Sequence, residues 1–141
     1  MPGVMATPYP FEFTDSGSSI RLRGFSNNAP IDRTIWLGEE GSPSGKAPDR
    51  MGYSRGRWNN EQVLVVQTTQ VDWPYFDDSA GTPQSDAVEI TEVFTLSDDQ
   101  QRLDYRMTVT DPELFTEPAT VIETYWAALG DALVQPPDCA N

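Results

Sequence analysis

The sequence predicts a single all-β domain, an antiparallel meander of about eight strands that closes as a small barrel, with a β-sandwich as the alternative. Three observations predict this fold. Val, Ile, Thr and aromatic residues alternate with polar residues in the apolar segments. Twelve Pro and ten Gly fall mainly between those segments. The connections look local, without the crossover helices of a parallel α/β fold, and 141 residues suit one domain, which we take as 1–141.

The expected strands are short and follow one another along the chain. They cover residues 11–13, 19–25, 32–37, 56–58, 62–71, 87–96, 102–110 and 119–126. The polar run 38–50, rich in Gly, Ser and Pro, is expected to be an exposed loop, and Asn59 and Asn60 are expected to form a turn. A short helix is the alternative for 125–134, because Trp126, Leu129 and Leu133 recur at helical spacing.

The charge and residue usage of the chain exclude several classes of function. Nine Lys and Arg stand against 22 Asp and Glu, and a net charge of −13 argues against nucleic acid and membrane surfaces as partners. There is no His, so a Ser-His triad is impossible, and we expect no metal and no cofactor. Without an apolar run of about 20 residues or a signal peptide at 1–7, the chain as written is expected to be soluble and cytoplasmic. Cys139 has no partner for an internal disulfide.

Three charged residues interrupt the apolar faces of the expected strands. Glu92 shares a face with Ile90 and Phe94, while Glu123 and Arg33 occur in similar positions on their own strands. If these faces point inward, the interior holds two carboxylates and a guanidinium.

Two interpretations of these charges remain open. In the first, Arg33 forms a bidentate pair with Glu92 or Glu123 and ties distant strands together. In the second, the charges line a ligand pocket, where desolvation would raise the pKa of an unpaired Glu and suit it to acid/base catalysis. The pocket interpretation makes Glu92 and Glu123 the catalytic candidates. The candidate ligand-binding residues are Arg33, Trp58, Trp73, Tyr105 and Tyr125, with the loop 72–86 lying over the mouth.

Several segments of the chain carry a family resemblance. They are 7–13 (TPYPFEF), 33–35 (RTI), 51–58 (MGYSRGRW), 81–87 (GTPQSDA), 91–94 (TEVF) and 111–118 (DPELFTEP). Together they resemble a widespread family of uncharacterised bacterial β-rich proteins, whose members are often longer at the N-terminus and exported to the periplasm. The resemblance implies the fold but no particular activity. Members commonly have His where this chain has Gln84, which argues against a His-dependent activity here. Separately, Gly56-Arg57-Trp58 before a hairpin is similar to the Gly-x-Trp of lipocalins, which implies that Trp58 closes one end of the barrel.

Three functions are compatible with this sequence. The first is a lipocalin-like barrel that binds a small, largely apolar molecule. The second is an enzyme on the same scaffold, of the isomerase, cyclase or hydratase type, that uses Glu92 or Glu123 as acid or base with help from Tyr105 or Tyr125. The third is a protein-protein interaction module, a homodimer among the options, that uses an aromatic surface around Trp36, Trp73 and Trp126.

Overall fold

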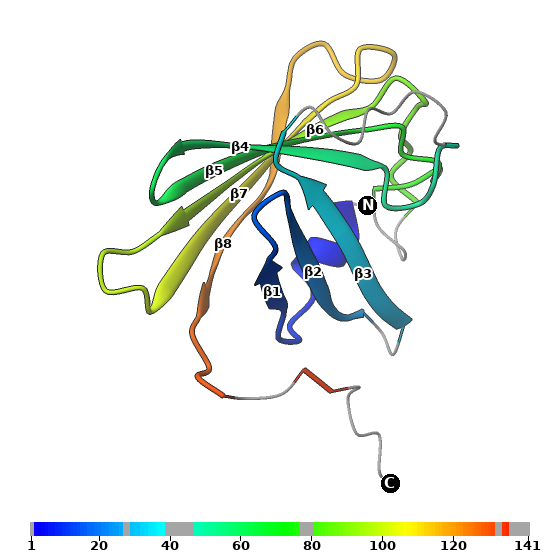
Figure 1. Ribbon diagram of the computed structural model, residues 1–141. Coiled ribbons are helices and arrows are strands. Elements are labelled where there is room, and N and C mark those ends of the chain that lie inside the picture. The colour runs from blue at the N-terminus through cyan, green and yellow to red at the C-terminus, as the bar shows by residue number, and fades with distance from the viewer. Residues whose placement is uncertain (1, 27–28, 39–46, 77–80, 132–133, 136–141) are drawn as a thin grey trace, which may run out of the picture.

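The described residues of the chain form one eight-stranded β-sheet (Figure 1). The computed structural model describes residues 2–26, 29–38, 47–76, 81–131 and 134–135. The strands are β1 (Glu12–Asp15), β2 (Ser19–Ser26), β3 (Ala29–Trp36), β4 (Tyr53–Asn60), β5 (Val63–Thr69), β6 (Glu89–Leu96), β7 (Arg102–Thr110) and β8 (Ala119–Ala127). They lie in the sheet in chain order, after a short 3₁₀ helix, η1 (Pro2–Ala6). The predicted all-β meander is therefore confirmed.

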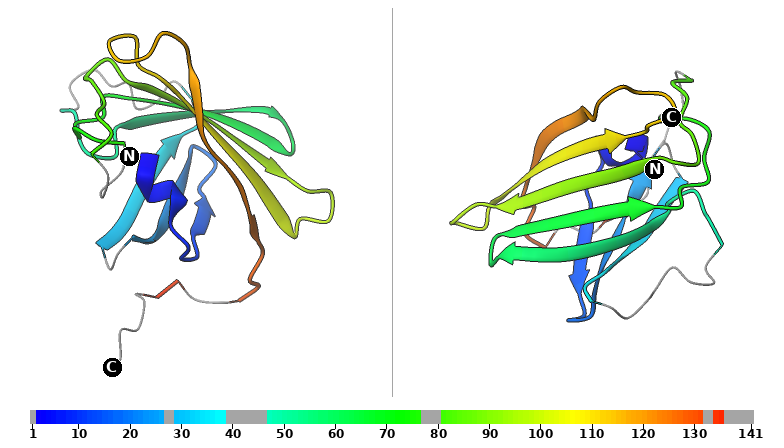
Figure 2. Two further views of the ribbon diagram at one scale, coloured as in Figure 1. Left: turned by 180° about the vertical axis from the view of Figure 1, so that it is seen from behind. Right: turned by 90° about the horizontal axis from the view of Figure 1, so that it is seen from above.

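The sheet curls into a half-barrel with two free margins. β1 pairs only with β2 and β8 pairs only with β7 among the described strands, so the hydrogen-bonded ladder does not close on itself. Figure 2 shows the β1–β3 part turned across the hollow side of the sheet formed by β4 to β8. The architecture is a single curled sheet, and the two packed sheets of the sandwich alternative are not formed by the described residues.

One junction departs from the predicted antiparallel order. β3 and β4 pair in parallel, through Ile35 with Ser54 and Trp36 with Arg55 only. The connection 37–52 is long enough to carry the chain back to the other end of the sheet before β4 begins, as a parallel pair requires. β2 and β3 pair along eight residues each, so the short β3–β4 ladder is the weakest seam of the sheet.

Two further expectations about local structure are wrong. β4 includes Asn59 and Asn60, and the turn falls at 61–62, where the Asn60 Oδ1 atom accepts hydrogen bonds from the backbone N–H groups of Gln62 and Val63. The short helix considered for 125–134 is not formed by the described residues of that stretch, because 125–127 belong to β8.

The core lies on the concave side of the sheet and is closed at one end by η1. The buried apolar residues are Val4, Met5, Ile20, Leu22, Ile31, Ile35, Leu64, Val66, Val71, Phe76, Val88, Ile90, Phe94, Tyr105, Met107 and Val109. The backbone N–H of Gly3 donates a hydrogen bond to the carbonyl oxygen of Phe76 at 2.7 Å, and Phe76 packs against Phe115. The 72–86 loop is thus fastened beside η1 through Phe76.

Gly52 fixes the start of β4 against the end of β5. It has φ +70°, and a Cβ atom there would lie 2.7 Å from the carbonyl oxygen of Thr69. Gly17 also has a positive φ, of +84°, but has open space around it. The two glycines therefore separate the cost of backbone conformation from the cost of a steric collision.

We expect Gly17→Ala to lower the free energy of unfolding by about 1–2 kcal/mol, the cost of the left-handed conformation. Gly52→Ala should cost about 1–3 kcal/mol more, because the new methyl group meets backbone that cannot rotate away. Urea unfolding followed by circular dichroism measures both. Equal losses in the two variants would show that the contact with Thr69 is not tight.

Candidate functional site

Five polar side chains meet inside the half-barrel, one from each of five strands. They are Arg33 of β3, Ser54 of β4, Thr68 of β5, Glu92 of β6 and Tyr105 of β7. Side chains alternate between the two faces of a sheet, and each of these five lies on the face of its strand that points into the half-barrel. All five are buried, with Glu92 at 0% and Arg33 at 2% exposure.

Arg33 and Glu92 form a bidentate ion pair. The Arg33 Nη1 atom donates to Glu92 Oε1 at 2.9 Å, and Nη2 donates to Oε2. Burial alone would lower the pKa of Arg33, but the charge and the hydrogen bonds of Glu92 hold it above its ordinary value. The first interpretation of the charged residues, an Arg33–Glu92 pair tying distant strands, therefore describes the interior.

Two hydroxyl groups and a sulfur atom accept the remaining N–H groups of the guanidinium. Arg33 Nε donates to Ser54 Oγ at 3.0 Å, Nη2 donates to Thr68 Oγ1 at 2.9 Å, and Nη1 also lies 3.9 Å from the Met5 sulfur. All five N–H donors of Arg33 thus have an acceptor. The Tyr105 hydroxyl donates to Glu92 Oε1 at 2.7 Å. Burial, together with the negative charge of Glu92, raises the pKa of Tyr105, so this hydroxyl stays protonated.

Glu123 lies on the outside of the half-barrel, and the prediction of a second interior carboxylate is wrong. Its side chain is 66% exposed and pairs with Arg106 of β7 at 2.8 Å. Ile122 and Trp126 of β8 are the half-buried residues that pack against the core. Both faces of β8 carry apolar residues, so alternation alone did not identify the buried face.

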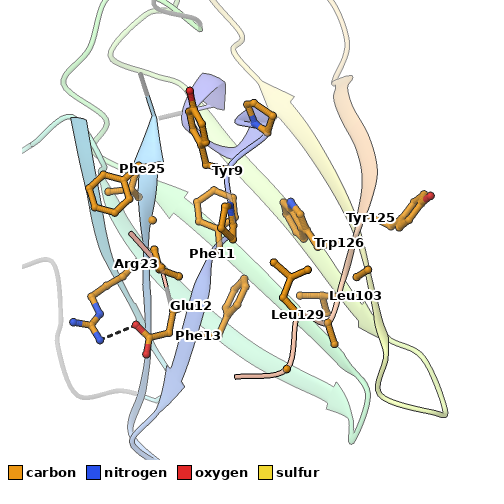
Figure 3. A pocket seen from close by; sticks show the side chains of 18 of the residues that line it. Tyr9, Phe11, Glu12, Phe13, Arg23, Phe25, Leu103, Tyr125, Trp126 and Leu129 are labelled. Carbon is orange, nitrogen blue, oxygen red and sulfur yellow. Dashed lines mark hydrogen bonds and ion pairs between the residues drawn. The ribbon is translucent and has the colours of Figure 1, made fainter. Parts of the chain in front are cut away.

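An aromatic cleft lies between the first hairpin and β8 (Figure 3). Phe11 and Phe13 approach from the N-terminal side, and Trp126 and Leu103 form the facing wall. Phe11 and Trp126 make an edge-to-face contact with ring centroids 5.6 Å apart. The cleft has a volume of about 1300 Å³, and Leu129 extends into it from the segment after β8.

The cleft wall is continuous with the buried polar cluster. Trp126 packs on Tyr105 with a centroid separation of 4.9 Å, and Phe94 lies 4.9 Å from Tyr105 and 6.0 Å from Phe13. Tyr105 in turn donates its hydroxyl to Glu92. One set of aromatic rings therefore joins the open side of the molecule to its charged interior.

The two arginines at the rim of the cleft are already paired with carboxylates. Arg23 donates to Glu12 at 2.7 Å, with both side chains about half exposed. Arg102 binds Asp104 at 2.5 Å and lies 4.5 Å above the ring of Tyr125. The rim offers no unpaired cation from these two arginines to an anionic ligand.

The predicted ligand-binding residues are dispersed. Tyr125 borders the cleft, but its ring is 58% exposed and points away from Trp126 (Figure 3). Tyr105 lies beneath the cleft, and Arg33 is enclosed in the polar cluster. Trp58 is 47% exposed near the end of β4 rather than buried, and Trp73 packs under Arg50 in the 72–86 loop.

Sequence reasoning did not identify the cleft residues Phe11, Phe13 and Leu103. From the sequence, Trp126 is expected in a helical pattern with Leu129 and Leu133 or in an aromatic surface with Trp36 and Trp73, but not in a cleft. Ile122 and Trp126 lie on one face of β8 and indicate that this face points inward. Val121 and Tyr125 are equally apolar and indicate the opposite face. The cleft residues come from distant strands, and only the curl of the sheet brings them together.

Two of the sequence segments named above, 81–87 and 111–118, meet at the 72–86 loop. The carboxylate of Asp111, which is 1% exposed, accepts hydrogen bonds from both the backbone N–H and the hydroxyl of Ser85 at 2.7 Å. Burial would raise the pKa of Asp111, but the hydrogen bonds from Ser85 and from the N–H groups of Glu113 and Leu114 hold it below its ordinary value. Neighbouring Gln84 is buried and donates to the carbonyl of Trp73.

We expect Glu92→Gln to lower the free energy of unfolding by about 3–5 kcal/mol, because it leaves the Arg33 charge buried without compensation. Glu123→Gln removes an exposed partner of Arg106 and should change stability little. Urea unfolding of both variants checks this. A similar small loss in both would mean that water reaches the interior pair.

The hydrogen bonds to Asp111 predict acid sensitivity. Because its pKa is lower when folded than when unfolded, the ionised group adds stability above about pH 4, and this stability is lost as the pH falls further. The difference in unfolding free energy between wild type and Asp111→Asn should be constant from about pH 7 to 4 and shrink below it. Asp131→Asn, at an exposed site, is the control and should match wild type. A difference that is independent of pH would contradict the assignment.

Comparison with protein-family models, curated proteins and solved structures found no match. Within the described residues, no group of three or more Asp, Glu or Cys side chains is arranged to hold a metal ion, and no helix is long and apolar enough to span a membrane.

Proposed function

We propose that the protein binds a small, largely apolar molecule in the cleft between the first hairpin and β8. The observation that carries this proposal is the aromatic wall formed by Phe11, Phe13 and Trp126 beside a hollow of about 1300 Å³. Concave sites lined mainly by apolar and aromatic groups are the usual form of small-molecule sites.

The size and charge of the cleft narrow the class of ligand. Its volume exceeds the roughly 300–1000 Å³ of common ligand sites, so a small molecule fills part of it and the rest stays open to solvent. Arg23 and Arg102 at the rim already have carboxylate partners. Recognition therefore depends mainly on ring stacking and apolar contact, and the exposed Asp131 carboxylate at the rim disfavours an anionic ligand.

In this proposal the ligand site is the cleft and not the barrel interior, where the sequence predicts it. Arg33 and Glu92 lie behind its wall, where Tyr105 links them to Trp126. Both Glu92 oxygens accept hydrogen bonds within the polar cluster, and the side chain is fully buried. A substrate has no path to this carboxylate without unfolding its surroundings, so the geometry favours binding over acid/base catalysis.

We expect saturable binding of Nile red, a neutral dye whose fluorescence rises in an apolar site. Trp126→Ala should weaken binding about tenfold, the loss that follows from removing about 1.4 kcal/mol of apolar contact. Leu129→Ala, at an exposed residue that reaches into the cleft, should weaken it by a smaller factor without loss of stability.

The matched control for this test is Trp58→Ala. Trp58 is also half exposed but lies on β4, away from the residues that line the cleft. Its removal should leave the affinity for the dye unchanged. Absence of saturable binding in wild type, or equal weakening by Trp58→Ala, would refute the proposal.

A further inference from the structure

β8 is a long strand with a free edge. Eight of its nine residues pair with β7 between Ala119 and Ala127, Val121 lies at a β-bulge without a partner, and no described strand lies along the other edge of β8. Figure 2, viewed from above, shows β8 at the outer margin of the curled sheet. Backbone N–H and C=O groups along such an edge point away from the sheet without a ladder partner.

Apart from a β-bulge at Val121, β8 lacks the features that usually prevent strand addition. Its sequence, ATVIETYWA, contains no Pro, Gly or Lys and is rich in β-branched and aromatic residues. Its one charge, Glu123, is paired with Arg106. On the outer face Val121 and Tyr125 are 43% and 58% exposed. The other free strand, β1, has four residues with two acidic groups among them, so it is the better protected edge.

The surroundings of β8 are acidic. Glu113 and Glu117 precede it and Asp131 follows it, and all three are exposed without an ion-pair partner among the described residues. The whole chain carries a net charge of −13. This charge opposes pairing of β8 with a second copy of the chain and favours a basic partner.

We propose that the free edge of β8 binds an extended segment of another protein by strand addition, with apolar residues along the segment and Lys or Arg at its ends. Backbone hydrogen bonds supply the pairing, one face of the added strand meets Val121 and Tyr125, and the terminal cations meet the flanking carboxylates. The inference rests on the strand edge and not on the cleft, so it stands or falls separately from dye binding.

The test uses a synthetic peptide of alternating Val and Thr with two Lys at each end. We expect saturable binding and at least tenfold slower hydrogen exchange of β8 amides, with β5 amides unchanged. A peptide of the same sequence that is N-methylated along its centre keeps the side chains and charges but loses the donors, and it should bind at least tenfold more weakly. Equal binding of the two peptides would overturn strand addition.

Matched variants separate strand addition from general charge attraction. Val121→Lys and Gln67→Lys both add one positive charge at an exposed position, but Gln67 lies on β5 in the middle of the sheet. Only Val121→Lys should weaken peptide binding, by about tenfold or more. Equal effects would reduce the interaction to electrostatics. A wild-type dimer in sedimentation that Val121→Lys dissociates would assign the edge to a second copy instead and overturn the proposal.

Discussion

The bidentate contact between Arg33 and Glu92 is the interaction on which the interior depends. It joins β3 to β6 across the hollow of the sheet, where the β3–β4 ladder has only two residue pairs. A buried guanidinium is tolerated only when its donors are satisfied, and here Ser54 and Thr68 complete the set. The weak parallel seam is thereby reinforced through side chains rather than through backbone hydrogen bonds.

The same constraint separates the interior from the binding surface. Because the guanidinium and carboxylate use their hydrogen-bonding groups on each other and on their neighbours, the centre of the half-barrel is filled and η1 closes its end with Met5. An apolar cleft remains open where the sheet stops curling, between the first hairpin and β8. Tyr105 lies at the boundary, with its hydroxyl in the polar cluster and its ring against Trp126.

Incomplete closure gives the molecule two different surfaces for recognition. A closed barrel would pair β1 with β8 and satisfy both edges, but here the rings of Phe11 and Trp126 meet between strands that are not hydrogen-bonded to each other. The hollow beside these rings suits an apolar molecule, whereas the backbone edge of β8 suits an extended chain. The two surfaces adjoin at the end of β8, so their occupants would lie close together.

The sequence by itself determined the strand content, the chain order of the meander and the Arg33–Glu92 partnership as one of two interpretations, because alternation and misplaced charges are local signals. It could not orient β8, where Val121 and Tyr125 alternate with Ile122 and Trp126 and both faces read as apolar, so Glu123 was wrongly placed inside. Nor could it reveal the parallel β3–β4 pair or the cleft. Those features depend on how far the sheet curls and on which distant side chains the curl brings into contact, and only the tertiary structure decides that.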